Sequence, residues 1–476
     1  ILIKYLNEAQ SRCEILLHHI SQLLDVQRSK FPRFYFCDDK QILEILLACS
    51  NVKYLADDLL PVFPALSRFH VSIVDTARVM GIINTNGETF QFSRDFDYEF
   101  LSAVDLLART EKEMNFSVRS TILDALSSRE YTEPGKWLIR FPAQAVMVAE
   151  SIHFAANVTD FVHKSTSKPD MIEFINEVGE FIKTTNDFIR EYPQKIEQLS
   201  ALIAMKIRHR DILQELNDCE VISVDGFSWK KHLFHVIKQD KGIDQVYMQI
   251  GSYQIPYGYE MLSKMDIGLM TSEEESAALA LASCATQTEF SICKQLNGHR
   301  SVVKTFADSC GFPVFDVPAS CLRNVFAGAS AMHAVIRLRE VKELPATFPN
   351  FFGLVEAKMK IIKCENSFRE FDRANWCCLI HLDEDEVPSW LKQRLRPIDL
   401  AFEPPSEILM RLNQIRKEFN FTEDTPIDDA LHAIQKQKGI EFLTGIDLNQ
   451  SLPKANLFNE EIEMKQIKVF CSLPEY

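Results

Sequence analysis

The residues best placed to carry out chemistry lie between Gln295 and Ser301, in the run Gln-Leu-Asn-Gly-His-Arg-Ser. A helix-like stretch follows this segment, as it does in a phosphate-binding loop. Such a loop needs a glycine-rich turn, a lysine for the β and γ phosphate oxygens, and a hydroxyl for Mg²⁺. Here only Gly298 stands in the expected place, with His299 at the lysine position and Arg300 at the Ser/Thr position. The segment therefore decides between a nucleotide-hydrolysing protein and a scaffold.

Bulk composition suits an ordinary globular protein. The 476 residues are enough for two or three domains with sizeable cores. The net charge of −15 disfavours nucleic acid and anionic membranes as direct partners. No apolar run is long enough to cross a bilayer. The opening Ile-Leu-Ile-Lys-Tyr-Leu is typical of the middle of a helix and lacks signal-peptide features, so we expect an internal piece of a longer polypeptide, or its ordered part.

The 12 cysteines are scattered, without a Cys-x-x-Cys pair or a zinc-type spacing. This pattern favours reduced thiols in a reducing compartment and predicts no metal site. Glycine is scarce, at 15 residues, which favours helices over several glycine-rich ligand loops. No Ser-His-Asp or Cys-His set is suggested, so we predict no catalytic residue.

Helical periodicity dominates the first half of the chain. Apolar residues recur at helical spacing over 15–24, and Asp38 or Asp39 can cap the helix that follows. Between them Phe31–Phe36 (Phe-Pro-Arg-Phe-Tyr-Phe) contains Pro32 and predicts a strand or turn. Its three phenylalanines bury a large area, so an internal staple between helices is preferred to a partner-binding surface.

A small β insertion is expected at about 69–92, because two apolar runs flank the hairpin signal Asn86-Gly87. Helical spacing resumes from Tyr98 to Leu216. A strand is predicted at Val246–Gly251.

From about Ile255 the pattern alternates between helices and strands, which predicts a parallel α/β sheet. After Pro404-Pro405 the pattern is helical again. The expected helices are Ala277–Cys293, Val302–Cys310 and Cys321–Met332, and the expected strands are Val314–Val317, His333–Leu338 and Trp376–Leu382.

Five segments together resemble the dynein heavy chain family, in the family's order and over nearly the whole chain. They are Phe31–Phe36 with the acidic pair and Leu-rich helix after it, Lys206–Leu213, Asp225–Lys231, Tyr257–Glu260 and Arg394–Pro397. The first three resemble motifs of the family's linker, the fourth the start of its first AAA+ module, and the fifth an Arg-Pro element near the end of that module. The linker motif residues are Phe31, Pro32, Arg33, Phe34, Tyr35, Phe36, Arg208, His209 and Trp229. Arg210 departs from the family's Arg-His-Trp.

The resemblance allows the family's nucleotide-site positions to be carried over one at a time. The phosphate-loop lysine falls on His299 and the Mg²⁺-binding threonine on Arg300, after Gly298. In the second acidic motif Arg339 stands at the aspartate position and only Glu340 remains. The polar sensor position falls near Asp383, and Arg396 resembles the arginine of the Arg-Pro element. Since phosphoryl transfer depends on the missing groups, the resemblance implies a degenerate site without ATP or ADP as cofactor and without ATP hydrolysis.

Two other interpretations of these residues remain open. His299 and Arg300 could bind an anion at a helix N-terminus, although solvated loop residues are the simpler reading of the pattern. The segment from Cys377 to Glu386 has the form of a strand followed by acidic Mg²⁺ ligands, although acidic loops after strands are common. The pairs His18-His19 and His232/His235 are expected to be packing or surface histidines, and Cys310 and Cys321 to be small core residues.

The resemblance implies an α plus α/β fold. A helical linker rod with the β insertion covers 1–254, a degenerate AAA+ (P-loop-type) α/β domain covers 255–403, and a small helical subdomain, the lid, covers 404–476. The implied function is a non-catalytic structural or assembly component of the ciliary or flagellar axoneme. Its partners would be axonemal or dynein-complex proteins, with microtubules reached through other parts of the chain. The alternatives are a fragment of an active dynein that hydrolyses ATP in later modules, and a helical scaffold similar only by coincidence.

Overall fold

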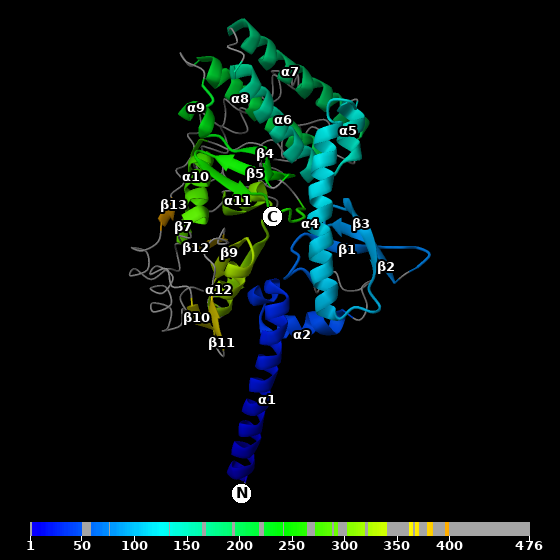
Figure 1. Ribbon diagram of the computed structural model, residues 1–476, viewed down its shortest axis with the longest axis vertical. Helices are drawn as coiled ribbons and strands as arrows, with labels where there is room; N and C mark the ends of the chain where they lie inside the picture. The colour runs from blue at the N-terminus through cyan, green and yellow to red at the C-terminus, as the bar shows by residue number, and fades with distance from the viewer. Residues whose placement is uncertain are drawn as a thin grey trace, which may run out of the picture.

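A computed structural model describes most of the chain up to residue 398. The described ranges are 2–49, 59–75, 77–132, 134–163, 168–192, 196–218, 223–240, 242–263, 272–287, 290–293, 302–318, 322–339, 361–364, 367–370, 378–383 and 396–398. The helical subdomain expected at 404–476 lies outside them. Figure 1 shows a body of helices and sheets from which one long N-terminal helix projects.

The N-terminal segment forms a helix, a tight turn and a second helix. They are α1 (Leu2–Lys30), the 3₁₀ helix η1 (Pro32–Phe36) and α2 (Asp39–Ala48). Asp38 caps α2 as predicted, in a capping box in which its side chain accepts from Gln41 N and the Gln41 side chain accepts from Asp38 N. The strand or turn expected at Phe31–Phe36 is instead a 3₁₀ helix, because Pro32 occupies its first turn, where the missing N–H is tolerated.

The predicted β insertion is confirmed as a three-stranded antiparallel sheet, β1 (Leu66–Val71), β2 (Arg78–Asn84) and β3 (Thr89–Asp97). Gly87 adopts a φ of 80° in the turn between β2 and β3, as the Asn86-Gly87 signal requires. The first strand begins and ends earlier than the pattern suggested. Figure 1 shows this sheet on one side of the long helix α4 (Ala103–Ser128).

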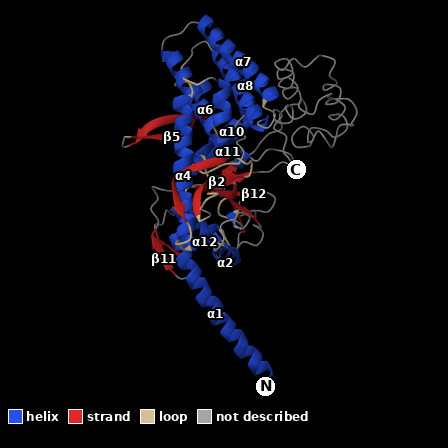
Figure 2. Cartoon of the chain, turned by 90° about the vertical axis from the view of Figure 1, so that its right-hand side faces the viewer, coloured by secondary structure: helices blue, strands red, loops and turns tan. Residues whose placement is uncertain are grey.

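Helices follow α4 as the periodicity predicted: α5 (Pro134–Arg140), α6 (Ala143–His163), α7 (Lys168–Glu191), α8 (Ile196–Asp218) and the short α9 (Phe227–Lys230). In Figure 2 α6, α7 and α8 lie together in the upper part of the molecule, and α1 leads away at the opposite end. The structure then adds a sheet of which only the middle strand was expected, namely β4 (Phe234–Asp240), β5 (Ile243–Ile250) and β6 (Tyr253–Pro256), all antiparallel.

The second half contains the expected parallel sheet. Its strands lie in the order β13 (Arg396–Ile398), β7 (Phe290–Cys293), β12 (Cys378–Asp383), β9 (Ala334–Arg339) and β8 (Val314–Pro318), and every neighbouring pair is parallel. The helices are α10 (Ser272–Gln287), α11 (Val302–Cys310) and α12 (Leu322–Ala331). A separate hairpin joins β10 (Ile361–Cys364) to β11 (Ser367–Glu370).

One element in this half was predicted wrongly. The helix expected at Ala277–Cys293 ends at Gln287, and Phe290–Cys293 forms strand β7 in the sheet. Apolar residues in a short run satisfy helix and strand patterns equally, and only the neighbouring strands β12 and β13 select the strand. This correction matters because it places a strand directly before the segment 294–301.

Among the residues that the structure describes, two buried cores are formed. The larger one runs from Leu24 in α1 to Leu262, and the smaller one packs α10 and α11 against the parallel sheet. The sheet β4–β6 contributes to both, through Val246 to the first and Met248 to the second. The domain division predicted at residues 254 and 255 falls within β6 and stays a prediction. Among the described helices none is long and apolar enough to span a membrane.

Candidate functional site

Two of the predicted nucleotide-site positions, Arg339 and Asp383, lie at the carboxyl edge of the parallel sheet. Asp383 at the end of β12 is in register with Cys293 at the end of β7, and Leu382 is in register with Leu338 of β9. Arg339 is the next residue of β9. Open α/β sheets bind ligands in the crevice outside the carboxyl ends of their strands, at the point where the strand order reverses. After β7 the chain crosses to the edge strand β8, returns through β9 and β12, and then forms β13 on the other side of β7. Strand β7 therefore lies at such a reversal.

The predicted site residues differ in how much the structure says about them. Gly298, His299, Arg300 and Glu340 lie outside the described residues. Arg339 and Asp383 are placed by their backbone alone, at the ends of neighbouring strands.

The side chain of Arg396 is described, and it serves the packing of the sheet. Its Nη1 donates to Ser283 Oγ at 2.6 Å, which ties the edge strand β13 to α10.

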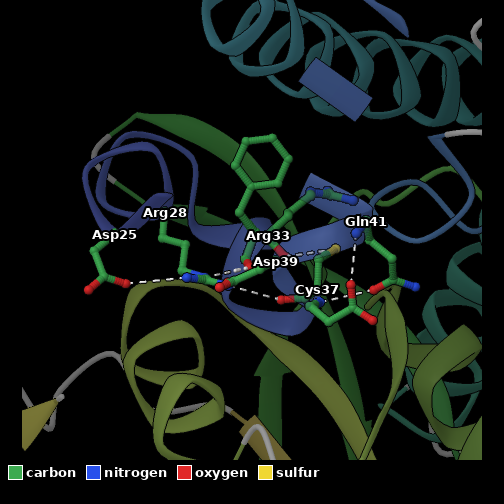
Figure 3. A network of polar contacts seen from close by, with 8 residues as sticks. Asp25, Arg28, Arg33, Cys37, Asp39 and Gln41 are labelled. Carbon is green, nitrogen blue, oxygen red and sulfur yellow. Dashed lines mark hydrogen bonds and ion pairs between the residues drawn. The ribbon is translucent and has the colours of Figure 1, made fainter. Parts of the chain in front are cut away.

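The linker motif residues form a second candidate site, at the junction of α1, η1 and α2. Figure 3 shows Arg28 of α1 reaching toward the far side of η1. Its guanidinium donates to Asp39 Oδ1 at 2.5 Å, to Asp25 Oδ1 at 3.3 Å, and to the carbonyls of Phe34 and Cys37 at 3.4 Å each. One buried arginine thus holds the end of α1, the turn and the start of α2 in a fixed relation.

Arg33, in the middle of the motif, is buried and points away from this network into the body of the protein. It donates to Glu260 Oε1 at 2.9 Å and Oε2 at 2.5 Å, to Glu111 Oε1 at 2.8 Å, and to the carbonyl of Val62 at 2.7 Å. Its guanidinium also lies 4.6 Å from the centre of the Phe63 ring. The contact with Glu260 joins residues 227 positions apart in the sequence.

Burial sets the electrostatics of this pair. Burial raises the pKa of Glu260 above its usual range, while Arg33 acts to lower it. The bidentate geometry satisfies both carboxylate oxygens, which is the arrangement that makes a buried ion pair tolerable. Removing one partner of such a pair costs about 3–5 kcal/mol, because the other charge is left buried and alone.

The segment that carries Glu260 is itself fixed on both sides. Gln144 of α6 donates to Tyr257 Oη at 3.0 Å and to the carbonyl of Glu260 at 2.7 Å, and it accepts from Leu262 N at 3.0 Å. The backbone amides of Gly258 and Glu260 donate to the carbonyls of Cys310 and Gly311 at 2.9 and 3.0 Å. Tyr257–Glu260 therefore connects the helical part to the end of α11.

The last aromatic residue of the motif contacts the parallel sheet. Phe36 stacks on Phe315 of β8, with ring centres 4.3 Å apart and planes at 17°. Phe31 and Phe34 turn the other way, packing edge to face at 5.0 Å in the large core. The predicted internal staple is confirmed, but it joins η1 to the sheet as well as joining helices.

The remaining motif residues meet in a second cluster. The His209 ring of α8 stacks on Phe154 with centres 3.8 Å apart, and Trp229 of α9 stacks on Phe234 of β4 at 4.2 Å. Burial, followed by the nearby charges of Lys206 and Arg208, holds the pKa of His209 well below its usual 6.5. The ring is therefore neutral at physiological pH and packs as an aromatic surface.

Arg208 leaves this cluster toward α10. Its Nη2 pairs with Glu275, in the first turn of α10, and His232 Nδ1 lies 2.9 Å from the same carboxylate. All three side chains are buried. His232 and His235 thus occupy buried sites that join elements, within the packing role predicted for them, while His18 and His19 are exposed on α1.

Sequence comparison shows which proteins this chain is similar to. Residues 1–125 match the family described as dynein heavy chain, N-terminal region 2. The chain is 24% identical over 254 residues to cytoplasmic dynein 2 heavy chain 1 of Caenorhabditis elegans, covering 52% of this chain and 6% of that protein. It is 21% identical over 262 residues to dynein axonemal heavy chain 1 of Homo sapiens, covering 55% and 6%. A solved RuvB mutant of Thermotoga maritima overlaps with a TM-score of 0.27 at 12% identity, over 37% of this chain and 62% of that one, which supports no argument.

These matches support a member of the dynein heavy chain family, at low identity, as the order of its motifs predicted. The chain spans about 6% of the length of the curated relatives it matches.

Several residues of the site escaped the sequence analysis. Glu260 was quoted within its motif without a role, and Glu275, Gln144 and Phe315 were not singled out at all. A usable signal was chemical, since an arginine inside an apolar, aromatic run is expected to be buried and then needs partners for its charge. Nothing in the sequence says which of 67 acidic residues that partner is.

Proposed function

We propose that this chain is the linker-like and degenerate ATPase part of a non-catalytic member of the dynein heavy chain family. In this role the parallel sheet is a rigid element for assembly, and no ATP or ADP is bound or hydrolysed there. The observation that carries the proposal is the order of the strands: β7 precedes the segment 294–301 and pairs with β12, which pairs in turn with β9, and the ends of β12 and β9 carry Asp383 and Arg339. This order supports a nucleotide-type site whose sequence lacks the lysine, hydroxyl and aspartate that the resemblance implies.

The side-chain charges at the predicted nucleotide positions give the physical basis of the proposal. A Mg²⁺-nucleotide needs a carboxylate for the metal, whereas the position of that carboxylate is occupied by Arg339. At the loop, His299 and Arg300 supply neither the lysine nor the hydroxyl, and an arginine cannot coordinate a metal. The two side chains remain compatible with a simple anion, which is the narrower alternative for this loop.

Purified protein comprising residues 1–476 tests the proposal. We expect no measurable ATP turnover, and no nucleotide in the supernatant after mild purification and acid precipitation. Turnover that disappears in His299→Ala would overturn the proposal, because it would show that this loop performs the chemistry. An active dynein motor fragment serves as the positive control for the assay.

The cellular role is proposed from the family. The matched relatives include axonemal heavy chains and cytoplasmic dynein 2 heavy chains. We propose a place in the cytoskeleton of the cilium or flagellum, in contact with dynein-complex or axonemal proteins. Fluorescent tagging of the full-length protein checks this, and a signal excluded from cilia would contradict it.

A second candidate function is an active dynein in which only this module is silent. It is favoured by the length of the relatives, which extends far beyond the part matched here. Turnover by the full-length protein that survives His299→Ala would support this candidate.

A further inference from the structure

The helical part and the parallel sheet touch at one edge of the sheet through η1. Phe36 stacks on Phe315 of the edge strand β8, 4.3 Å between ring centres. On the same side α12 approaches so closely that a Cβ on Gly328 would lie 2.7 Å from Phe36 Cζ and 2.9 Å from Tyr35 Cβ. No side chain fits at Gly328 without moving η1. We call this set the β8 contact.

The helical part and the parallel sheet are also joined through α8 and α10. Glu275 of α10 receives Arg208 of α8 and lies 2.9 Å from His232 Nδ1. Helix α10 is in turn tied to β13 by the 2.6 Å hydrogen bond from Arg396 to Ser283. We call Arg208, His232 and Glu275 the α10 contact.

These two contacts lie toward opposite edges of the same sheet, since β8 and β13 are its outermost strands. Figure 1 shows the same separation, with α12 low in the body near the top of α1, and α8, α9 and α10 above. On the helical side both contacts belong to one body, because a continuous buried core runs from Leu24 to Leu262. A rigid body held at one point can pivot, whereas one held at two separated points cannot pivot without breaking a contact.

We infer that the helical part is locked to the parallel sheet at both edges, so that a ligand at the carboxyl edge of the sheet cannot move one against the other. Between the two contacts, the hydrogen bond from His235 Nε2 to the carbonyl of Ser309, at 2.8 Å, is one further buried tie, and a single tie by itself allows pivoting. The lock goes beyond the proposed function, because it holds whether or not a nucleotide binds.

Fluorescence energy transfer between two exposed sites tests the lock in residues 1–476. One dye goes on Tyr131, after α4, and the other on Ala331, at the end of α12, through a non-natural amino acid that avoids the 12 cysteines. We compare the wild type, Phe36→Ala, Glu275→Gln and the double variant. Glu8→Gln, in an exposed ion pair on α1, is the charge-loss control.

We expect one narrow distance in the wild type, in the control and in each single variant, because the remaining contact still prevents pivoting. The double variant should show a distribution about twofold wider, a non-additive effect. A double variant as narrow as the wild type overturns the inference. If it does not fold, the milder pair Phe315→Leu with Arg208→Lys replaces it under the same criteria.

Adding Mg-ATP to the wild type separates this inference from the proposed function. A shifted distance overturns the lock, and an unchanged distance supports it in a sample to which the nucleotide binds. Nucleotide binding measured in the same sample by a fluorescent ATP analogue bears only on the proposed function.

Discussion

Replacing His235 by glutamine should make the stability of this protein less sensitive to acid. His235 of β4 is fully buried, its Nε2 is 2.8 Å from the carbonyl of Ser309, and its Nδ1 is 3.0 Å from Ser151 Oγ. A carbonyl only accepts, so Nε2 carries the proton and Nδ1 accepts from the serine hydroxyl. The ring is therefore neutral, and burial lowers its pKa from 6.5 to about 4, with the hydrogen bond to Ser309 opposing the shift.

The sign follows from which state binds the proton. Above pH 6.5 the His235 ring is neutral in both the native and the unfolded state, so its full contribution to the free energy of unfolding is present. Between pH 6.5 and 4 the unfolded chain binds a proton at His235 that the native protein does not bind, and this difference favours unfolding. A shift of about 2.5 pKa units corresponds to about 3 kcal/mol, lost progressively as the pH falls through this window.

Urea denaturation of the wild type and His235→Gln at several pH values between 7 and 4 measures this term. The wild type should be the more stable at pH 7, and its advantage should shrink by about 3 kcal/mol toward pH 4. His18→Gln, at an exposed position of α1, is the matched control for the loss of one histidine. An advantage that stays constant from pH 7 to pH 4 would refute the reasoning, since it would mean that His235 titrates alike in both states.

Two further substitutions probe the packing that positions the site. Glu150→Gln should lower the free energy of unfolding at pH 7 by about 3–5 kcal/mol, because it leaves the buried Lys206 and the partly buried Arg129 without their carboxylate. Burial raises the pKa of Glu150, but Lys206 and Arg129 outweigh it and hold the pKa at about 2, so the contribution of Glu150 is present above pH 4.5 and lost as the pH falls toward 2. Glu180→Gln, in an exposed pair, should change urea stability by less than about 1 kcal/mol, and equal effects would contradict this account. Gly328→Ala should destabilise by about 1–3 kcal/mol through overpacking against Phe36, whereas Gly179→Ala, with open space at its Cβ, should stabilise α7 by up to about 1 kcal/mol in thermal melts. The opposite order would show that η1 and α12 do not pack as described.

Local patterns in the sequence were sufficient where one element determines its own structure. The helix cap at Asp38 or Asp39, the hairpin at Asn86-Gly87 and the helix Val302–Cys310 were predicted, because capping, turn geometry and amphipathic spacing depend on residues a few positions apart. The same logic failed at Phe290–Cys293. A four-residue apolar run carries no periodicity of its own, and its strand is selected by pairing with β12 and β13.

By itself, the sequence determined the resemblance to dynein heavy chains and most of the helices, since ordered motifs and helical spacing are properties of the chain alone. It also determined that His299, Arg300 and Arg339 stand where the resemblance implies a lysine, a threonine and an aspartate. Only the tertiary structure decided which residues the linker motif contacts. Arg33 pairs with Glu260, Phe36 stacks on Phe315, and Arg208 pairs with Glu275. The physical reason is that a buried arginine or aromatic ring needs a suitable partner, and only the folded chain determines which distant residue lies close enough to be that partner.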